Sequence, residues 1–417
     1  MFDQKPGLMD DIRSRFAHVD TCPFEGKRIF FENAGGALTL KSVVETSAKF
    51  AAIPDNQGRA NGASAELMRI IADAKAATMT FLNATDGQVF VGESGTELLF
   101  RIIRDACIGS AEGSVIGSTI EHPASRSAAL RWAEEAGKTY LSVPHDDATG
   151  TVSAAAYAAI VRPDTRVATI LHTSPVTGMG NDVAAIAQAI RAAAPDCLII
   201  VDGIQHAAHG HIDIAAYCVD AYVMSAYKVF SRHGYGVAWI GPAVEALRHD
   251  ALVDGPVANW ELGTRDTGAY ATFADVIAYF GWLGSAFSEE PALRPRLEAA
   301  ARAIRAHEKA LTDAMINGVG NHAGLAAIDG VQIIGGAENP AREGLVCFRV
   351  EGQDEADLVE ALNRAGIRTH IRRADHYSGS VLRPLGMEAA IRVSLCHYNT
   401  VEEVGAFLDA VGAAIAA

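Results

Sequence analysis

Seven short apolar runs over residues 87–240, separated by Ala-rich or amphipathic stretches, constrain the fold of this 417-residue chain most strongly. The runs are QVFVGE, SVIGST, KTYLSVP, RVATILH, CLIIVDG, AYVMSA and GVAWIG, and their pattern predicts strands. Helices are predicted near 96–108, 123–136, 153–161 and 182–194. Repeated strand–helix–strand order favours an α/β fold with a mostly parallel sheet covered on both faces. The last three strands leave little room for long helices, which predicts an irregular or antiparallel edge.

The pattern changes after residue 265 and predicts a smaller C-terminal α/β domain. Two helical stretches and three weaker strands follow, at 267–287, 296–316, 344–350, 367–371 and 391–395. Thr400 with two glutamates in the next turn predicts a final helix over 400–416. We therefore expect three parts: an N-terminal arm packed on the small domain (1–28), a large domain (29–265) and the small domain (266–417).

Charge and cysteine usage limit the partners and the compartment. A formal net charge of −15 disfavours nucleic acid and anionic lipid as partners. No apolar run reaches the roughly 20 residues of a membrane span, and the polar N-terminus has no signal or transit pattern. The six scattered cysteines argue against a zinc site or a disulfide framework and favour a reducing cytoplasm. Arg368, Arg372 and Arg373 break the acidic trend; such a cluster is usually a solvated face, but an anionic substrate would give it another use.

Three segments place polar residues at the carboxyl ends of predicted strands, where open α/β sheets bind ligands. In VFVGESGTELLF (89–100) a strand passes through Gly95 and Thr96 into a helix, whose N-terminus can hold a phosphate. Asp202 follows a β-branched run, where a buried acid needs a cationic partner unless it is a helix cap. Lys228 follows the next strand and is either a surface lysine or a buried amine. An amine nucleophile, an acid and a phosphate cradle together are what pyridoxal phosphate (PLP) chemistry requires.

The series of motifs resembles the class V aminotransferases, the fold-type I PLP enzymes that include the cysteine desulfurases. The similar segments are FENAGGALTL (31–40), GESGTELLF, IEHPAS (120–125), VDGIQHAAHG, SAYK (225–228), ELGT (261–264) and RVSLCHYNTVEEV (392–404), in family order. The resemblance covers nearly the whole chain. It implies a fold-type I PLP transferase with a large, mostly parallel sheet domain and a smaller C-terminal α/β domain.

The resemblance also implies how the residues would hold PLP. Lys228 would form a Schiff base with the cofactor and move the α-proton of the substrate. Asp202 would pair with the pyridinium nitrogen, His122 would stack on the ring and Gln205 would bond its phenolic oxygen. The phosphate would be held by three residues: Gly95, Thr96 and Ser225.

The remaining matches concern the substrate and the assembly. Arg392 would clamp the α-carboxylate of an amino-acid substrate with its planar guanidinium, and Asn33 would lie nearby. Thr264 would reach the phosphate of a neighbouring subunit, which implies a homodimer with shared active sites.

Three segments depart from the family pattern. Tyr227 stands before the lysine where desulfurases often have His, and SPVTG (174–178) has Pro175 where the family has an Asn beside the ring. The third departure affects the reaction most. Where desulfurases carry the persulfide-forming cysteine, this chain has ADHYSGS (374–380), with His376 and Tyr377 and no thiol. Both side chains carry transferable protons, so they either act as a general acid beside the substrate or only shape the entrance of the site. Cys396 lies inside the predicted strand RVSLC and is expected to pack as a small hydrophobe.

These residues predict a PLP enzyme that binds an amino acid as an external aldimine and removes its α-proton. The resemblance favours a desulfurase-like or β-lyase-like outcome, with transamination second and epimerisation third. A catalytically silent PLP-fold binding protein is disfavoured because Lys228, Asp202 and His122 are all retained. A nicotinamide-dependent dehydrogenase is disfavoured because no GxGxxG turn follows the first strand.

Overall fold

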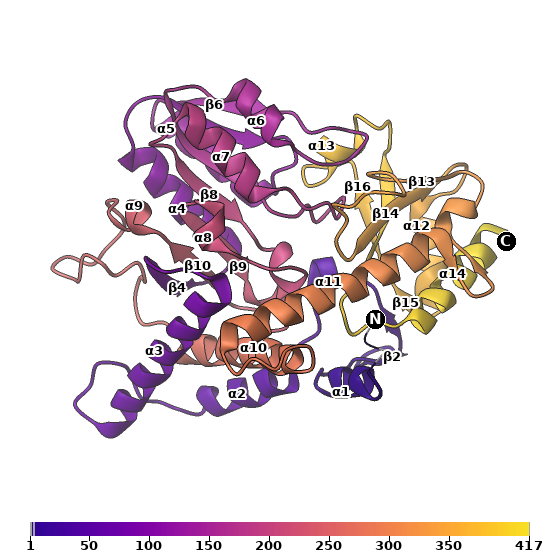
Figure 1. Cartoon of the computed structure of the whole chain (residues 1–417), viewed down its shortest axis with the longest axis horizontal. Helices are drawn as coiled ribbons and strands as arrows, with labels where there is room; N and C mark the ends of the chain where they lie inside the picture. The colour runs from indigo at the N-terminus through magenta and orange to yellow at the C-terminus, as the bar shows by residue number, and fades with distance from the viewer. Residues whose placement is uncertain (1, 3–4, 417) are drawn as a thin grey trace.

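The computed structural model describes residue 2 and residues 5–416, and it has two α/β parts (Figure 1). The larger part contains a seven-stranded sheet in the order β4-β10-β9-β8-β7-β5-β6. Its strands are β4 (Gln88–Gly92), β5 (Ser114–Ser118), β6 (Thr139–Val143), β7 (Thr165–Leu171), β8 (Leu198–Asp202), β9 (Ala221–Ser225) and β10 (Gly236–Ile240). Each of them coincides with one of the seven predicted strands, so the large sheet is confirmed.

The antiparallel part of the sheet lies one strand inside its edge. Strands β5 to β9 pair in parallel, whereas β10 runs antiparallel to both β9 and β4. The chain between β9 and β10 is too short for the helical crossover that a parallel pair needs. The predicted irregularity is therefore confirmed, although it occupies the second strand and not the outermost one.

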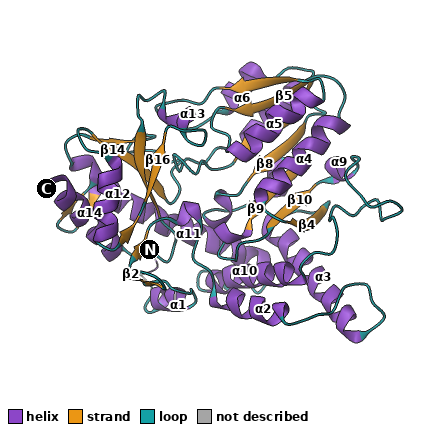
Figure 2. Ribbon diagram, turned by 180° about the vertical axis from the view of Figure 1, so that it is seen from behind, coloured by secondary structure: helices purple, strands orange, loops and turns teal. Residues whose placement is uncertain are grey.

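Apart from the edge strand β6, the strands are almost entirely buried because both faces of the sheet are covered (Figure 2). Phe90, Ile200 and Val223 pack in the core under α4 (Gly95–Gly109) and α5 (Pro123–Glu135). Their neighbours Val91 and Val201 point to the opposite core, which also contains residues of α6 (Ala154–Ile160) and α7 (Val183–Ala193). Alternate residues of each strand therefore enter opposite cores, and the polar residues of the site follow the carboxyl ends of the strands.

Long helices flank the β4 edge of the sheet. Helix α10 (Thr267–Ser285) packs against α2 (Lys41–Ala51), α3 (Gly62–Leu82) and α11 (Leu293–Asn317). The sequence predicted α10 and α11 but not α2 and α3. Short elements complete this part: α8 (Ile214–Tyr217), α9 (Pro242–Glu245) and three 3-10 turns at Asn33–Gly35 (η2), His206–Ala208 (η3) and Ala226–Lys228 (η4).

The smaller part is built on a four-stranded antiparallel sheet in the order β13-β14-β17-β16. These strands are β13 (Val331–Ile333), β14 (Leu345–Val350), β16 (His370–Arg373) and β17 (Ala389–Ser394), with α12 (Glu355–Arg364) and α14 (Val401–Ala416) packed on them. Helix α14 starts as predicted: Thr400 Oγ1 accepts from Glu403 N–H, and the Glu403 carboxylate accepts from Thr400 N–H. The remaining elements are β11 (Gly318–Val319), β12 (His322–Ala323), β15 (Ile367–Arg368), α13 (Gly379–Leu382) and the 3-10 turn Leu325–Ala327.

The N-terminal segment lies against both the long helices and the small sheet (Figure 1). It contains α1 (Leu8–Ser14), β1 (Thr21–Cys22), β2 (Gly26–Lys27) and β3 (Ile29–Phe30). Strand β3 pairs in parallel with β15, and the ring of Phe16 contacts both Tyr398 and Tyr279 of α10. The division at residues 28 and 265 stays a prediction. Among the described residues, no helix is long and apolar enough to cross a membrane.

Candidate active site

Lys228 lies in the turn directly after β9 and is almost completely buried, with 7% of its surface exposed. Its Nζ donates a hydrogen bond to Gln205 Oε1 at 3.1 Å. Burial, and next the charge of Arg392, lowers the pKa of this lysine to about 7, against the opposing effect of Asp202. A lysine with such a pKa is a neutral nucleophile for a substantial fraction of the time near neutral pH.

Asp202 ends β8, the strand next to β9, and both of its oxygens are used. Oδ1 accepts from the Ile204 N–H at 3.1 Å, and Oδ2 accepts from Ser125 Oγ at 3.3 Å. Burial raises the pKa of Asp202 to about 6, although the Ile204 hydrogen bond and the charge of Lys228 pull it down. The acid and the amine thus occur at adjacent strand ends, as the sequence predicted for two consecutive motifs.

The start of α4 approaches the end of β9 so closely that only glycine fits at position 95. A Cβ there would collide with Ser225 Oγ and with the side chain of Ile204. Ser94 caps the helix by accepting from Glu97 N–H at 3.1 Å, and Thr96 is exposed in the first turn. Helix N-termini with free N–H groups bind phosphates, so this corner, the acid and the buried amine together fit PLP.

His122 is the N-cap of α5 and pairs with Tyr377 from the small domain. Its Nδ1 accepts from Ala124 N–H at 3.1 Å, and its Nε2 lies 2.7 Å from Tyr377 Oη. Burial, with smaller effects of Lys228 and Arg372, lowers the pKa of His122 to about 3, so the ring is neutral. Because Nδ1 is an acceptor, the single ring proton lies on Nε2 and is donated to Tyr377, whose own hydroxyl proton stays available.

Gln205 connects the lysine to a buried pair that the sequence interpretation missed. Its Nε2 lies 3.3 Å from His209 Nε2, and His209 Nδ1 lies 2.9 Å from Glu308 Oε2. These contacts fix the orientation of the Gln205 amide. His209 and Glu308, with Cys396, also bring possible metal-ligand atoms within 4.8 Å of one another. The sequence does show that Gln205 and His209 are four residues apart within VDGIQHAAHG, a spacing at which two side chains can meet on one side of a helical turn.

Two arginines from neighbouring strands of the small sheet reach the site. Arg392 on β17 is 2% exposed and donates through Nη1 to Pro175 O at 3.1 Å, and Arg372 on β16 packs its guanidinium 3.9 Å from the centre of the Tyr377 ring. Burial, and next the charge of Arg372, lowers the pKa of Arg392 to about 10. The sequence shows Arg372 as part of a basic cluster but does not assign it to the active site.

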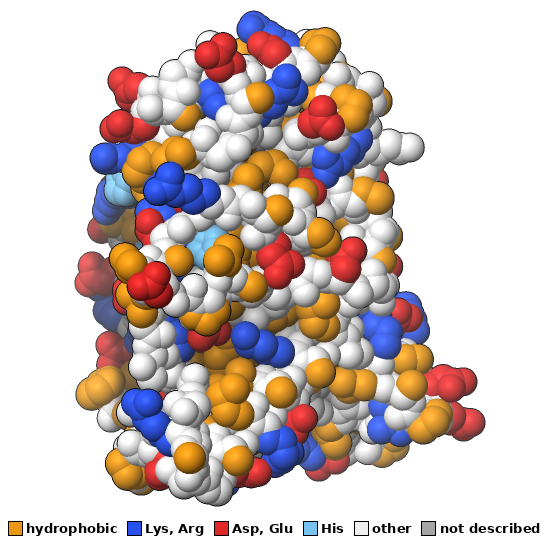
Figure 3. Space-filling view, turned by 90° about the vertical axis from the view of Figure 1, so that its left-hand side faces the viewer, with side chains coloured by type: hydrophobic (Ala, Val, Ile, Leu, Met, Phe, Trp, Pro, Cys, Tyr) orange, Lys and Arg blue, Asp and Glu red, His pale blue; other side chains and the backbone are white. Residues whose placement is uncertain are grey.

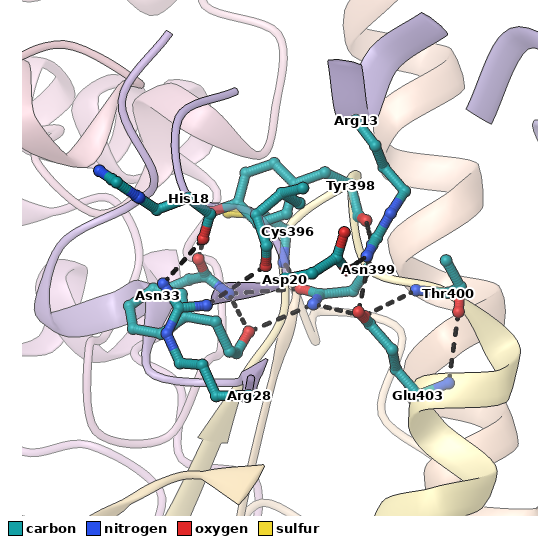
Figure 4. Close-up of polar contacts among 12 residues, drawn as sticks. Arg13, His18, Asp20, Arg28, Asn33, Cys396, Tyr398, Asn399, Thr400 and Glu403 are labelled. Carbon is teal, nitrogen blue, oxygen red and sulfur yellow. Dashed lines mark hydrogen bonds and ion pairs between the residues drawn. The ribbon is translucent and has the colours of Figure 1, made fainter. Parts of the chain in front are cut away.

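Three residues that the sequence assigns to the substrate or to the partner subunit are not hydrogen-bonded to Lys228, Asp202 or Arg392 in the described part of the structure. Asn33 belongs to a buried cluster with the C-terminal signature (Figure 4): its Nδ2 donates to Ser394 O at 2.8 Å, and its Oδ1 accepts from Tyr398 Oη. The adjacent turn still lies against the site, since a Cβ at Gly35 would be 3.6 Å from Arg392 Nη2. Thr264 and His376 are both exposed. The substrate and partner-subunit roles of these three residues stay predictions.

The cysteines nearest to the site are buried and protonated. Cys396 is 1% exposed, and burial raises the pKa of its thiol well above the ordinary value. Cys347 lies opposite Arg392 on β14, but burial raises its pKa to about 11 despite the nearby arginines. Neither thiol has the exposed, thiolate-favouring surroundings of a sulfur-transfer cysteine.

Comparison with known proteins identifies the family. The family described as Aminotransferase class-V matches residues 29–407, so the chain belongs to this family of PLP-dependent enzymes. Cysteine desulfurase-like protein ustD of Aspergillus flavus is 25% identical over 96% of this chain and 89% of its own length. A probable cysteine desulfurase of Pseudomonas putida is 28% identical over 79% of each chain.

Solved structures show the same fold. The cysteine desulfurase CsdA from Escherichia coli superposes with a TM-score of 0.79 over 98% of both chains at 21% identity. A cysteine desulfurase from Thermococcus onnurineus NA1 gives a TM-score of 0.80 over 96% of both chains at 20% identity. The solved structures confirm the fold-type I architecture. Membership of the class V family confirms the PLP cofactor and the enzymatic nature that the resemblance implied.

Proposed function

We propose that this enzyme removes the α-proton of an amino acid and expels a β-substituent, with Tyr377 as the proton donor to the leaving group. The observation that carries this proposal is the hydrogen bond between Tyr377 and His122. Tyr377 lies on the segment where desulfurases carry their cysteine. Burial raises the pKa of the Tyr377 hydroxyl, which keeps it protonated at neutral pH. A protonated hydroxyl is a general acid and cannot accept a sulfur atom as a persulfide.

The residues described above divide the work of holding PLP and moving protons. PLP, once bound, supplies the electron sink that makes the α-carbon acidic. Gly95 and Ser225 form the corner that would hold its phosphate, Asp202 would pair with the ring nitrogen, and Gln205 would orient the ring oxygen. Lys228 has the low pKa needed to take the α-proton and to return it elsewhere.

Arg392 would orient the substrate by its α-carboxylate. Its Nη1 is held by Pro175 O, and its Nε has no hydrogen-bond partner among the described residues. The pairing of guanidinium with carboxylate is planar and two-pronged, so it fixes the direction of the α-carbon toward Lys228. This is how binding would be converted into a defined geometry for proton removal.

We further propose that the active unit is a cytoplasmic homodimer. The loop between α9 and α10 carries three strongly exposed apolar side chains, Leu252, Val253 and Val257, and leads to the exposed Thr264. It projects from the side of the molecule that faces the viewer in Figure 3, where apolar side chains are scattered among charges of both signs. All six cysteines are free thiols, as suits a reducing compartment.

The assembly can be tested with the holoenzyme in solution. A stable dimer interface with shared sites should bury roughly 2,000 Å² or more, so sedimentation should give twice the chain mass. Replacing Val253 and Val257 with aspartate should weaken the dimer and lower PLP retention together. A monomer with full PLP occupancy would contradict the proposal.

The reaction can be tested by incubating the holoenzyme with a panel of amino acids. The products to measure are α-keto acid, alanine, sulfide and the amine form of the cofactor. Release of the β-substituent with a keto acid supports β-elimination. Stoichiometric conversion of the cofactor to its amine form, without loss of a β-substituent, would establish transamination instead.

A further inference from the structure

We infer that the substrate carries a second carboxylate, at the end of its side chain, and that Arg372 binds this group. The inference rests on the proposed function, because it assigns Arg392 to the α-carboxylate. It concerns the class of substrate that the site selects, namely an amino acid whose leaving β-substituent carries the second carboxylate; aspartate and glutamate serve as binding probes.

The guanidinium of Arg372 presents an unused edge inside the protein. Only 9% of the residue is exposed, yet Nε and Nη2 have no hydrogen-bond partner among the described residues. These two nitrogens form one side of the guanidinium plane, which is the side that binds a carboxylate through two parallel hydrogen bonds. Buried charged groups are normally paired, since an unpaired one is expensive.

The two arginines are placed for a ligand that spans them. In the antiparallel pair of β16 and β17, Arg372 is opposite Ala390 and His370 is opposite Arg392, so both arginines point to the same face of the sheet. Residues in this diagonal relation have Cα atoms roughly 7–8 Å apart. Arg372 also influences the pKa values of Lys228, His122 and Arg392, which places its charge within reach of the reacting groups.

Among the described residues, no acid forms an ion pair with Arg372 or Arg392, although Asp375 and Glu32 interact with them at longer range. Asp202 accepts from Ile204 N–H and Ser125 Oγ and is assigned to the ring nitrogen of PLP. Asp375 accepts from the backbone N–H groups of Tyr377 and Ser378, and Glu32 lies 3.2 Å from His370 Nδ1. Since one carboxylate satisfies Arg392, Arg372 remains as the binding group for another.

The stacking of Arg372 on Tyr377 allows a competing explanation, in which the arginine only supports the tyrosine ring. The two explanations differ in selectivity. A supporting role would affect every amino acid equally, whereas a carboxylate-binding role favours an acid over its amide of the same shape. The ratio of affinities for acid and amide therefore separates them.

The test is an equilibrium titration of the holoenzyme, followed by cofactor absorbance, with aspartate, asparagine, glutamate, glutamine and alanine. We expect at least one acid to bind roughly 10- to 100-fold more tightly than its amide, the range for a charged hydrogen-bonded pair. Arg372→Gln should remove this preference, and Arg372→Lys should retain part of it. Arg373→Gln, on the adjacent exposed arginine, should leave it unchanged.

A second measurement does not depend on the reaction. Succinate and maleate, which have no amino group, should raise the melting temperature of the wild-type holoenzyme and of Arg373→Gln but not of Arg372→Gln. Amides that bind as tightly as acids, or an Arg372→Gln variant that weakens both equally, would overturn the inference. If no amino acid of any kind perturbs the cofactor, the proposed function itself fails, which is a distinguishable result.

Discussion

The two sides of the site differ in how completely their polar groups are paired. On the large-domain side, both oxygens of Asp202 and both ends of the Gln205 amide have hydrogen-bond partners. On the small-domain side, Arg372 and Arg392 retain guanidinium nitrogens without a partner among the described residues. A fully paired shell defines one geometry, which suits a cofactor shared by a whole family. Unpaired cations bind a ligand, and Arg372 would discriminate between substrates by their side chains.

The largest effect is expected on the large-domain side, from Lys228→Ala. This variant removes the buried amine that follows β9 and is assigned to the covalent bond with PLP, so the cofactor absorbance band and all turnover should be lost. Borohydride reduction of the wild type, followed by peptide mapping, should locate the cofactor on Lys228. Lys41→Ala, at an exposed position, is the control. A cofactor adduct on any other lysine would show that the large-domain side of the site does not hold PLP.

The second effect concerns the small-domain side. Tyr377→Phe removes one hydroxyl and keeps the ring on which Arg372 stacks. Loss of a general acid should lower turnover roughly 100-fold or more, while the dissociation constants for cofactor and amino acid change little. Steady-state rates and spectral titrations measure the two quantities separately.

His376→Ala is the matched control for this variant, because His376 is the exposed neighbour in the same segment. We expect a much smaller loss of turnover from it. Equal losses in both variants would mean that the segment only shapes the entrance of the site, the alternative left open by the sequence.

The difference between the two sides also explains what the sequence could predict. Asp202, Lys228 and Gly95 follow strands that were recognisable as short apolar runs, and parallel strands bring their carboxyl ends to one edge. Their convergence therefore follows from local pattern and general topology. Helices α2 and α3, outside the alternating region, had no comparable signal and were missed.

The contacts on the small-domain side could not be predicted from the sequence. Tyr377 and His122 are 255 residues apart in the sequence, and nothing in either motif indicates that they meet. Arg372 is indistinguishable in sequence from its exposed neighbour Arg373; only the register of β16 against β17 places one inside and the other outside. Alternation along a strand needs a known register before it assigns a face.

The pH dependence of cofactor attachment tests whether the two sides influence each other. Lys228 has a lowered pKa of about 7, so its amine is protonated below that pH and free above it. The rate at which PLP becomes covalently attached to the apoprotein should therefore rise as the pH increases through about 7 and then level off. Rapid-mixing absorbance measurements across pH 5.5–9 would record this profile.

Arg392→Gln should move the midpoint of this profile upward, because the charge of Arg392 is one of the causes that lower the pKa of Lys228. Arg373→Gln should not move it. A midpoint that stays fixed in Arg392→Gln would show that the arginine side does not act on the lysine electrostatically, and the two sides would then be independent.

The smallest effect is expected from Cys396→Ala. The thiol is buried beside Tyr398, and its raised pKa keeps it protonated, so it is a packing group and not a nucleophile. Turnover should be unchanged, while the melting temperature falls because the substitution leaves a small cavity. Cys347→Ala, which removes the other buried thiol near the arginines, should behave in the same way.

Mass spectrometry during turnover with cysteine should detect no persulfide on either residue. A persulfide on Cys396 or Cys347 would instead make the small-domain side a sulfur acceptor, and Tyr377 would lose its assigned role as the group that replaces the desulfurase cysteine.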